Sequence, residues 1–124
     1  MNCLNILRDH DFKVQHFQRI SKVLTTQVYF DLYLLDDSYQ SYLFNYFDSF
    51  EKWIYREKSM SHINNRAYLA FVQKCRTIAR HYADVNFKPE KLEGILANET
   101  NIQAGLWLAK KIAQVIRLKE QRPL

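Results

Sequence analysis

Glycine, proline and cysteine are scarce in this sequence of 124 residues, which holds only two of each. Four glycines and prolines cannot supply the turns that a many-stranded β-fold needs every ~8–12 residues. Two cysteines, Cys3 and Cys75, make neither a disulfide framework nor a Cys-x-x-Cys pair. We expect both to be free thiols of a cytoplasmic protein, with Cys75 buried as a small apolar side chain.

Long apolar runs are also absent. The longest stretches without a charged residue are 38–47 and 100–109, whereas a membrane-spanning helix needs about 18 or more mostly apolar residues. The first residues, MNCLNILRDHD, lack the basic region and apolar stretch of a secretory signal. The sequence therefore predicts no membrane span and no secretory signal.

Apolar residues make up 48% of the chain, which is too many for a disordered protein, and they recur at every third or fourth position, as in helices. We predict an all-α fold of five to six helices in antiparallel hairpins, either a small bundle or a short helical-repeat-like solenoid. One domain would cover residues 1–124, with 1–10 and 119–124 frayed. Helices are expected at 11–25, 28–35, 39–57, 62–82, 89–98 and 101–118.

Three signals place the ends of these helices. Residues 36–38, Asp-Asp-Ser, are typical of a turn and N-cap, and Pro89 suits the first position of a helix. Ser61 and either Thr100 or Asn101 are further candidate caps. Taken alone, the run VYFDLYLL at 28–35 fits either a strand or a helix, and its helical neighbours favour a helix.

Four apolar stripes follow from the spacing. Phe17, Ile20 and Leu24 form the first, and a second and third run through 43–54 and 68–82. The last helix is expected to turn Ile102, Leu106, Ala109, Ile112, Ala113 and Ile116 inward, with Trp107, Leu108 and Val115 at the edge of that stripe.

Aromatic residues are concentrated in one region, since 29–55 holds 11 of the 18 in the chain. They occupy more than one face of the helix expected at 39–57, and a helix that is apolar on several sides is usually buried on several sides. One interpretation is an aromatic core. The other is a partner-binding face, whose candidate residues are Tyr42, Phe44, Tyr46, Trp53 and Tyr55.

Basic residues outnumber acidic ones by 18 to 13, and the excess lies in the second half of the chain. Residues 61–83 contain no acid, and 101–124 contain five basic residues and one acid. If the outer faces of the last two long helices are neighbours, they form one phosphate-binding surface. Its candidate residues are Arg66, Lys74, Arg80, Lys110, Lys111 and Arg117. The alternative is ordinary solvated helix faces.

Signals for catalysis are lacking. The four histidines do not pair at metal-ligand spacing, and Gly94 and Gly105 alone cannot build a phosphate-binding loop. Acid pairs such as Asp48 and Glu51 have no evident cause for a raised pKa. We therefore expect no enzymatic activity, no metal, no cofactor and no small-molecule substrate.

Four blocks carry a resemblance to a protein family: YFDLYLL, DSFEKWIYREKSMS, NRAYLAFVQKC and LWLAKKI, in that order. Across residues 23–112 the chain resembles the C-terminal end of a group of large, mostly helical bacterial proteins of unknown function. It departs from the group at 51–53, where Glu-Lys-Trp replaces an Arg-rich stretch. The resemblance implies either the closing end of a helical array or a stand-alone copy of it.

Together these features predict a non-enzymatic protein–protein interaction or structural module. Its partner, another protein or a second copy, would dock on the aromatic helix at 39–57. The alternative function is nucleic-acid binding by the basic faces of the helices at 62–82 and 101–118.

Overall fold

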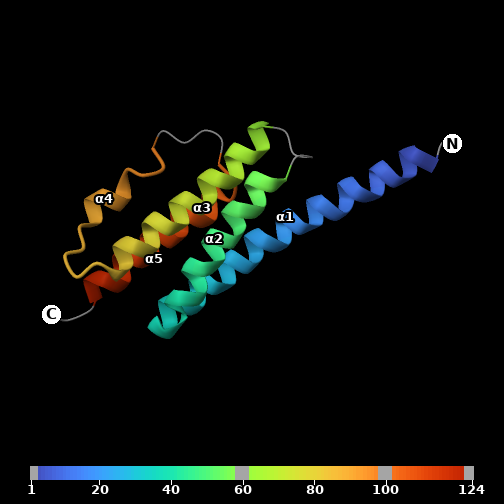
Figure 1. The fold of residues 1–124 in the computed structure, drawn as a ribbon. Coiled ribbons are helices and arrows are strands. Elements are labelled where there is room, and N and C mark those ends of the chain that lie inside the picture. The colour runs from blue at the N-terminus through green and yellow to red at the C-terminus, as the bar shows by residue number, and fades with distance from the viewer. Residues whose placement is uncertain (1–2, 58–61, 98–101, 122–124) are drawn as a thin grey trace. The chain divides into compact units, whose positions relative to one another are not determined.

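The chain is all-α in its structure, a computed structural model that describes residues 3–57, 62–97 and 102–121, and their side chains except at 3–13, 15, 62 and 63. The elements are α1 (Cys3–Leu35), the short 3-10 helix η1 (Asp37–Tyr39), α2 (Gln40–Arg56), α3 (His62–Ala83), α4 (Pro89–Glu93) and α5 (Gly105–Gln121) (Figure 1). No strand occurs in these described ranges. The predicted fold class is confirmed.

The chain divides into two compact units, Met1–Tyr46 and Phe47–Leu124. The boundary falls inside α2, so that unit 1 holds α1, η1 and residues 40–46, and unit 2 holds the rest. The prediction of one domain over 1–124 stays a prediction beside this division.

Unit 1 is dominated by α1, which continues without a break through the ambiguous run at 28–35. It begins at Cys3, although the sequence led us to expect fraying up to residue 10. Extending an existing helix by one residue costs far less than starting one. The helix formed by the later residues of α1 therefore extends back through residues 3–10. α5 likewise extends to Gln121, beyond the expected fraying point at 119.

The predicted turn after α1 is confirmed. Asp36 has extended backbone angles, and its carboxylate accepts a hydrogen bond from the Ser38 backbone N–H at 2.9 Å. This bond lowers the pKa of the Asp36 carboxyl, because it stabilises the charged form. The turn leads the chain back so that the Tyr29 and Tyr46 rings lie 5.5 Å apart, centroid to centroid.

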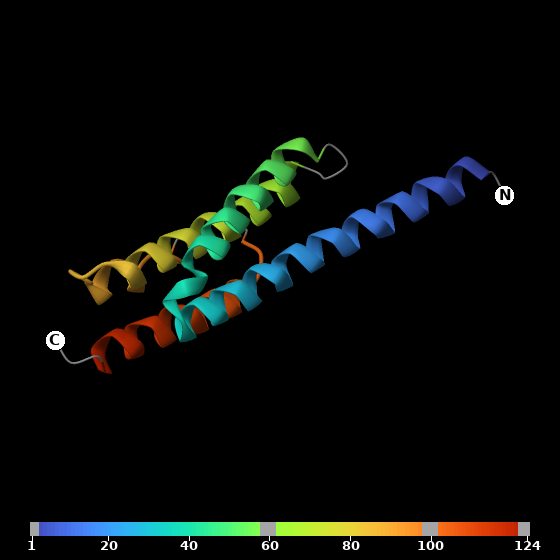
Figure 2. The ribbon, with the colours of Figure 1, turned by 60° about the horizontal axis from the view of Figure 1, so that its bottom comes forward.

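Unit 2 has a closed apolar core. α3 contributes every residue of its predicted stripe, namely Tyr68, Phe71, Val72, Cys75, Ile78, Ala79 and Tyr82, all buried. Phe50 of α2 packs against Tyr68 with ring centroids 6.5 Å apart, and Phe71 meets Trp107 of α5 edge-on at 6.0 Å. α3 therefore contacts both α2 and α5 in this core, and Figure 2 shows the red ribbon of α5 running below α3.

The inward face of α5 differs from our prediction. The structure buries Leu108, Ile112 and Val115, whereas Leu106 is 84% exposed and Ala109 and Ala113 also face outward. Both sets of positions have helical spacing. Burying Leu108 and Val115 removes more apolar surface from water than burying two alanines, so the stripe with larger side chains is the buried one.

The segments on either side of α4 also depart from the prediction. α4 ends at Glu93 rather than 98, because Gly94 disfavours the helix that would run through it. α5 begins at Gly105 rather than 101. Just before it, Ala104 has a φ of 57°, in the left-handed region, and its carbonyl accepts the Leu108 N–H at 3.0 Å. The proposed caps Ser61, Thr100 and Asn101 lie outside the described residues.

Candidate interaction surfaces

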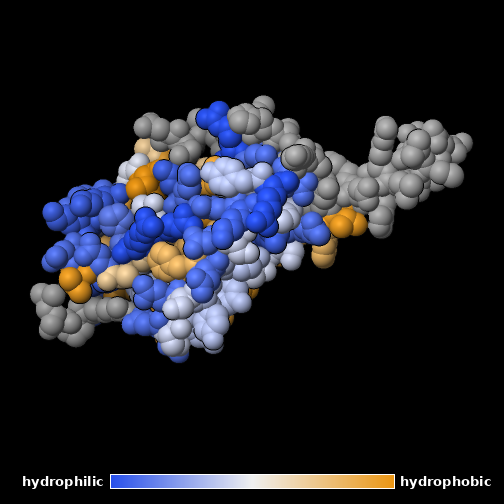
Figure 3. All heavy atoms as spheres, viewed as in Figure 1, coloured by the Kyte–Doolittle hydropathy of each residue, from blue (hydrophilic) through white to orange (hydrophobic). Residues whose placement is uncertain are grey.

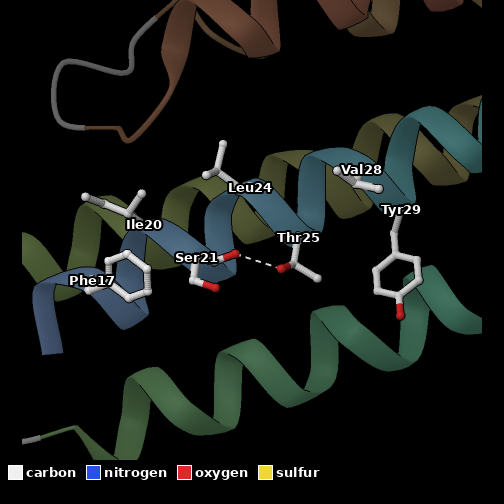
Figure 4. A pocket seen from close by; sticks show the side chains of 7 residues that line it. All are labelled: Phe17, Ile20, Ser21, Leu24, Thr25, Val28 and Tyr29. Atoms are coloured by element: carbon white, nitrogen blue, oxygen red, sulfur yellow. Dashed lines mark hydrogen bonds between the residues drawn. The ribbon is translucent and has the colours of Figure 1, made fainter. Parts of the chain in front are cut away.

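An apolar stripe on α1 in unit 1 is exposed to solvent. It consists of Phe17, Ile20, Leu24 and Val28, whose exposed fractions range from 42% to 72%, and we call it the α1 stripe. Figure 4 shows these side chains projecting along one side of the helix. They line a shallow groove of about 440 Å³ together with Ser21, Thr25 and Tyr29.

The groove along the α1 stripe is uncharged. Its polar members are Ser21 and Thr25, and the Thr25 hydroxyl donates to the Ser21 carbonyl within the same helix at 2.7 Å. The cationic Arg19 lies on the buried face of α1, together with Val23 and Phe30. Groups that would attract a charged ligand are therefore absent from the lining of this groove.

Sequence reasoning found three members of the α1 stripe but gave them no role. The stripe continues to Val28, across the point where the sequence left the secondary structure ambiguous. A reading of residues 14–35 as one helix would have shown the full length of the stripe. Nothing in the sequence, however, says which face of such a helix is covered.

The five aromatic residues predicted to bind a partner are spread over both units. Tyr42, Phe44 and Tyr46 belong to unit 1, and Trp53 and Tyr55 belong to unit 2. Tyr42 and Tyr55 are 62% and 70% exposed, and the other three are half-buried.

Three of these rings have contacts inside their own unit. The Tyr42 centroid lies 6.1 Å from that of Tyr39, and the Trp53 centroid lies 6.2 Å from that of Phe50. Tyr46 packs on Tyr29, and burial raises the pKa of the Tyr46 hydroxyl, with a hydrogen bond to Thr25 acting in the opposite direction. The aromatic partner-binding face remains a prediction.

The six candidate phosphate-binding residues all lie in unit 2, on α3 and α5. Arg66, Arg80, Lys110 and Arg117 are exposed, and Lys74 and Lys111 are half-buried. The surface over α3 in Figure 3 is mostly hydrophilic. Lys111 is engaged locally, since its ammonium donates to Gln114 at 2.9 Å and lies 5.5 Å from the Trp107 ring centroid.

The four exposed basic candidates lie on the outer faces of two helices. Arg66 and Arg80 lie opposite the buried side of α3 at helical spacing, and Lys110 and Arg117 lie opposite the buried side of α5. The basic residues remain candidates on two separate faces.

The Arg76 guanidinium in unit 2 makes several side-chain contacts, although Arg76 was not among the candidate phosphate-binding residues. Its guanidinium forms ion pairs with Asp48, at 2.9 Å, and with Glu51, and it lies 5.7 Å from the Phe47 ring centroid. The Arg76 side chain is only 17% exposed. These contacts join α2 to α3, so the role of Arg76 is structural. In the sequence Glu51 and Asp48 lie 25 and 28 positions before Arg76, and no local pattern indicates this pairing.

A second groove, also of about 440 Å³, lies between α5 and the turns that follow α4. Its lining is made of Glu93, Leu96, Ala97, Ala109, Ile112, Ala113 and Ile116. The residues of α5 in this groove include the alanines that we expected to be buried. This groove contains fewer large apolar side chains than the groove along the α1 stripe.

Groups suited to catalysis are not gathered at any of these surfaces. In 3–57, 62–97 and 102–121 there is no cluster of three or more His, Cys, Asp or Glu residues that could hold a metal ion. Cys75 is a free, fully buried thiol, as predicted, and burial raises its pKa well above the ordinary value. It therefore stays protonated at neutral pH and is a poor nucleophile.

The described helices include none that is long and apolar enough to cross a membrane. Comparison of the chain with protein-family models, with curated proteins and with solved structures gave no match.

Proposed function

We propose that this chain is a non-enzymatic interaction module that binds another protein segment through exposed apolar side chains. The α1 stripe carries the proposal. Its four large apolar residues stay open to water over three turns of one helix, and a contiguous exposed patch of this kind is typical of a protein-binding surface. The exposed Tyr42 and Tyr55 are a second, smaller contribution from the predicted aromatic helix.

The chemistry of the groove supports a protein segment as the ligand. An uncharged, mostly apolar groove along a helix matches the apolar face of a second amphipathic helix, which docks through residues spaced three and four apart. The resemblance to the end of large helical proteins agrees with this proposal, because the closing end of a helical array packs on helices. The chain would act by holding its partner in place.

Nucleic-acid binding remains the second candidate, because Arg66, Arg80, Lys110 and Arg117 are exposed. Binding through these residues would be electrostatic and would weaken about 10³-fold or more between 50 and 200 mM salt for six or more phosphate contacts.

Site-specific photo-crosslinking in cells that make the protein tests the proposal. A photoreactive benzoylphenylalanine replaces Leu24 in the α1 stripe, and in a matched control it replaces Lys110 on the basic face of α5. We expect discrete protein–protein products from position 24 and few from position 110. Products that contain nucleic acid, formed mainly at position 110, would favour the second candidate. Absence of protein products at position 24 would refute the interaction proposal.

A further inference from the structure

The ammonium of Lys119, near the end of α5, contacts the end of α3 and the loop that joins α3 to α4. It donates a hydrogen bond to the Asp84 carbonyl at 3.1 Å. It also lies 5.8 Å from the Tyr82 ring centroid and 5.7 Å from the Phe87 ring centroid. Two aromatic faces and one carbonyl oxygen therefore meet a single positive charge, and each of these groups attracts a cation.

The α3–α4 loop, residues 84–88, has hydrogen bonds of its own that do not involve Lys119. The Asp84 N–H donates to the His81 carbonyl at 3.2 Å, and the Asp84 carboxylate accepts the Asn86 N–H at 2.9 Å. Asp84 directly follows the last residue of α3, at the end of the helix where the dipole is negative. The loop thus presents its carbonyl oxygen at a position that favours a cation.

The helix that follows this loop has few other attachments. α4, drawn in orange in Figure 1, is five residues long, and Leu92 is its one buried residue. A helix of this length is not stable by itself. Because the loop leads directly into Pro89, the first residue of α4, a contact that holds the loop also positions α4. The position of α4 therefore depends on Leu92 and on the loop that Lys119 contacts.

The second groove depends on the same segment. Glu93, Leu96 and Ala97 form one side of this groove, and α5 forms the other. The first of these residues ends α4, and the other two lie in the turns that follow it. If the segment 84–97 moved away from α5, this side of the groove would be lost. The groove is therefore a feature of the chain only while the segment is held in place.

We infer that Lys119 is a charge-dependent latch, whose ammonium holds the α3–α4 loop, α4 and the following turns against α5. Loss of the charge releases this segment. The core of α2, α3 and α5 stays packed, because it is joined by other contacts, such as those of Phe50 with Tyr68 and of Phe71 with Trp107. The latch lies in unit 2 and does not involve the α1 stripe, so it does not rest on the proposed function.

Amide hydrogen exchange of the purified full chain tests the latch. The reporters are three amides whose hydrogen bonds lie within the segment, those of Lys91, Ile95 and Ala97. Lys119→Gln keeps a polar side chain but removes the charge, and should speed exchange at these amides by about 5- to 30-fold, because two cation–aromatic contacts are lost. Lys119→Arg keeps the charge and should exchange like the parent.

Two further measurements separate the release of one segment from a general loss of stability. The amides of α3 around Cys75 should exchange at the parental rate in Lys119→Gln, since the core stays packed. The matched control Lys110→Gln removes an exposed charge from the same helix and should change none of these rates. The latch would be refuted by parental exchange of the segment in Lys119→Gln, by equal acceleration in α3, or by the same acceleration in Lys110→Gln or Lys119→Arg.

A double-mutant cycle with Phe87 tests whether the aromatic faces hold the ammonium. Phe87→Leu keeps an apolar side chain but removes one of the two rings. In this background Lys119→Gln should accelerate exchange less than it does in the parent, because the two residues share one contact. Equal acceleration in both backgrounds would show that Lys119 acts independently of Phe87 and would overturn the latch as described.

Discussion

Two apolar stripes of the same helical periodicity have opposite environments in this chain. The stripe of α3 in unit 2 is buried along its whole length, between aromatic residues of α2 and α5. The α1 stripe in unit 1 remains open to water. Periodicity reports that a face is apolar, and only tertiary structure determines whether that face serves stability or remains available for binding.

The largest expected effect comes from the buried stripe. Phe71→Ala should destabilise the chain by about 3–5 kcal/mol, because it leaves a cavity beside Trp107 that the surrounding helices fill only in part. Urea unfolding followed by circular dichroism would measure this loss. A change below about 1 kcal/mol would mean that the core of unit 2 is looser than its burial indicates.

A smaller effect is expected from the charged contact at the edge of that core. Arg76→Met keeps the aliphatic stem over Phe47 but removes both ion pairs, and should cost about 1–3 kcal/mol because Glu51 loses its partner in a partly buried position. Arg80→Met, on the exposed face of α3, is the matched control and should change stability by less than about 0.5 kcal/mol. Equal effects of the two variants in thermal unfolding would show that the Arg76 pairs contribute nothing.

Alkaline pH should weaken unit 2 through Cys75. The folded chain keeps this thiol protonated at a pH where the unfolded chain has already lost the proton, because burial raises the pKa of the folded state. Its contribution is therefore complete below about pH 8 and declines as the pH rises past the ordinary thiol pKa of about 8.5, by at most about 1.4 kcal/mol per pH unit. The parent and Cys75→Ala chains should differ in the slope of stability against pH above 9, and equal slopes would contradict the assignment.

The smallest effect should come from the open stripe. Phe17→Ala, at a concentration where the chain is a monomer, should change the free energy of unfolding by less than about 0.5 kcal/mol, because the side chain is already largely solvated. Compared with Phe71→Ala, it gives a direct measure of the contrast between the two stripes. A loss of several kcal/mol in urea unfolding would show that the α1 stripe is covered within the monomer.

The sequence predicted correctly those parts of the fold for which the local pattern favours one arrangement. α3 has most of its large apolar residues on one side, so its buried face follows from spacing. The Asp36 cap follows from the chemistry of a short acidic side chain next to free backbone N–H groups. Neither feature depends on the arrangement of distant residues.

The features that could not be predicted depend on competition between elements. α5 carries two overlapping apolar stripes, and the choice of Leu108 and Val115 over Ala109 and Ala113 is made by the side chains that α3 presents. The pairing of Arg76 with Asp48 and Glu51 joins residues 25 and 28 positions apart, which no local pattern reveals. The exposure of the α1 stripe could not be predicted for the same reason. The pattern of one helix does not show whether another element packs over it.

The backbone conformation of Ala104 limits which residues can replace it. Its β-carbon is held at a φ of 57°, a conformation that costs about 1–2 kcal/mol for a residue other than glycine. Replacement by glycine would relieve that strain and give the unfolded chain only about 0.4–1 kcal/mol more freedom, so glycine should be slightly more stable than alanine here. Position 104 should therefore accept glycine with a small gain in stability, whereas a β-branched residue, which adopts this backbone conformation least readily, should destabilise the start of α5.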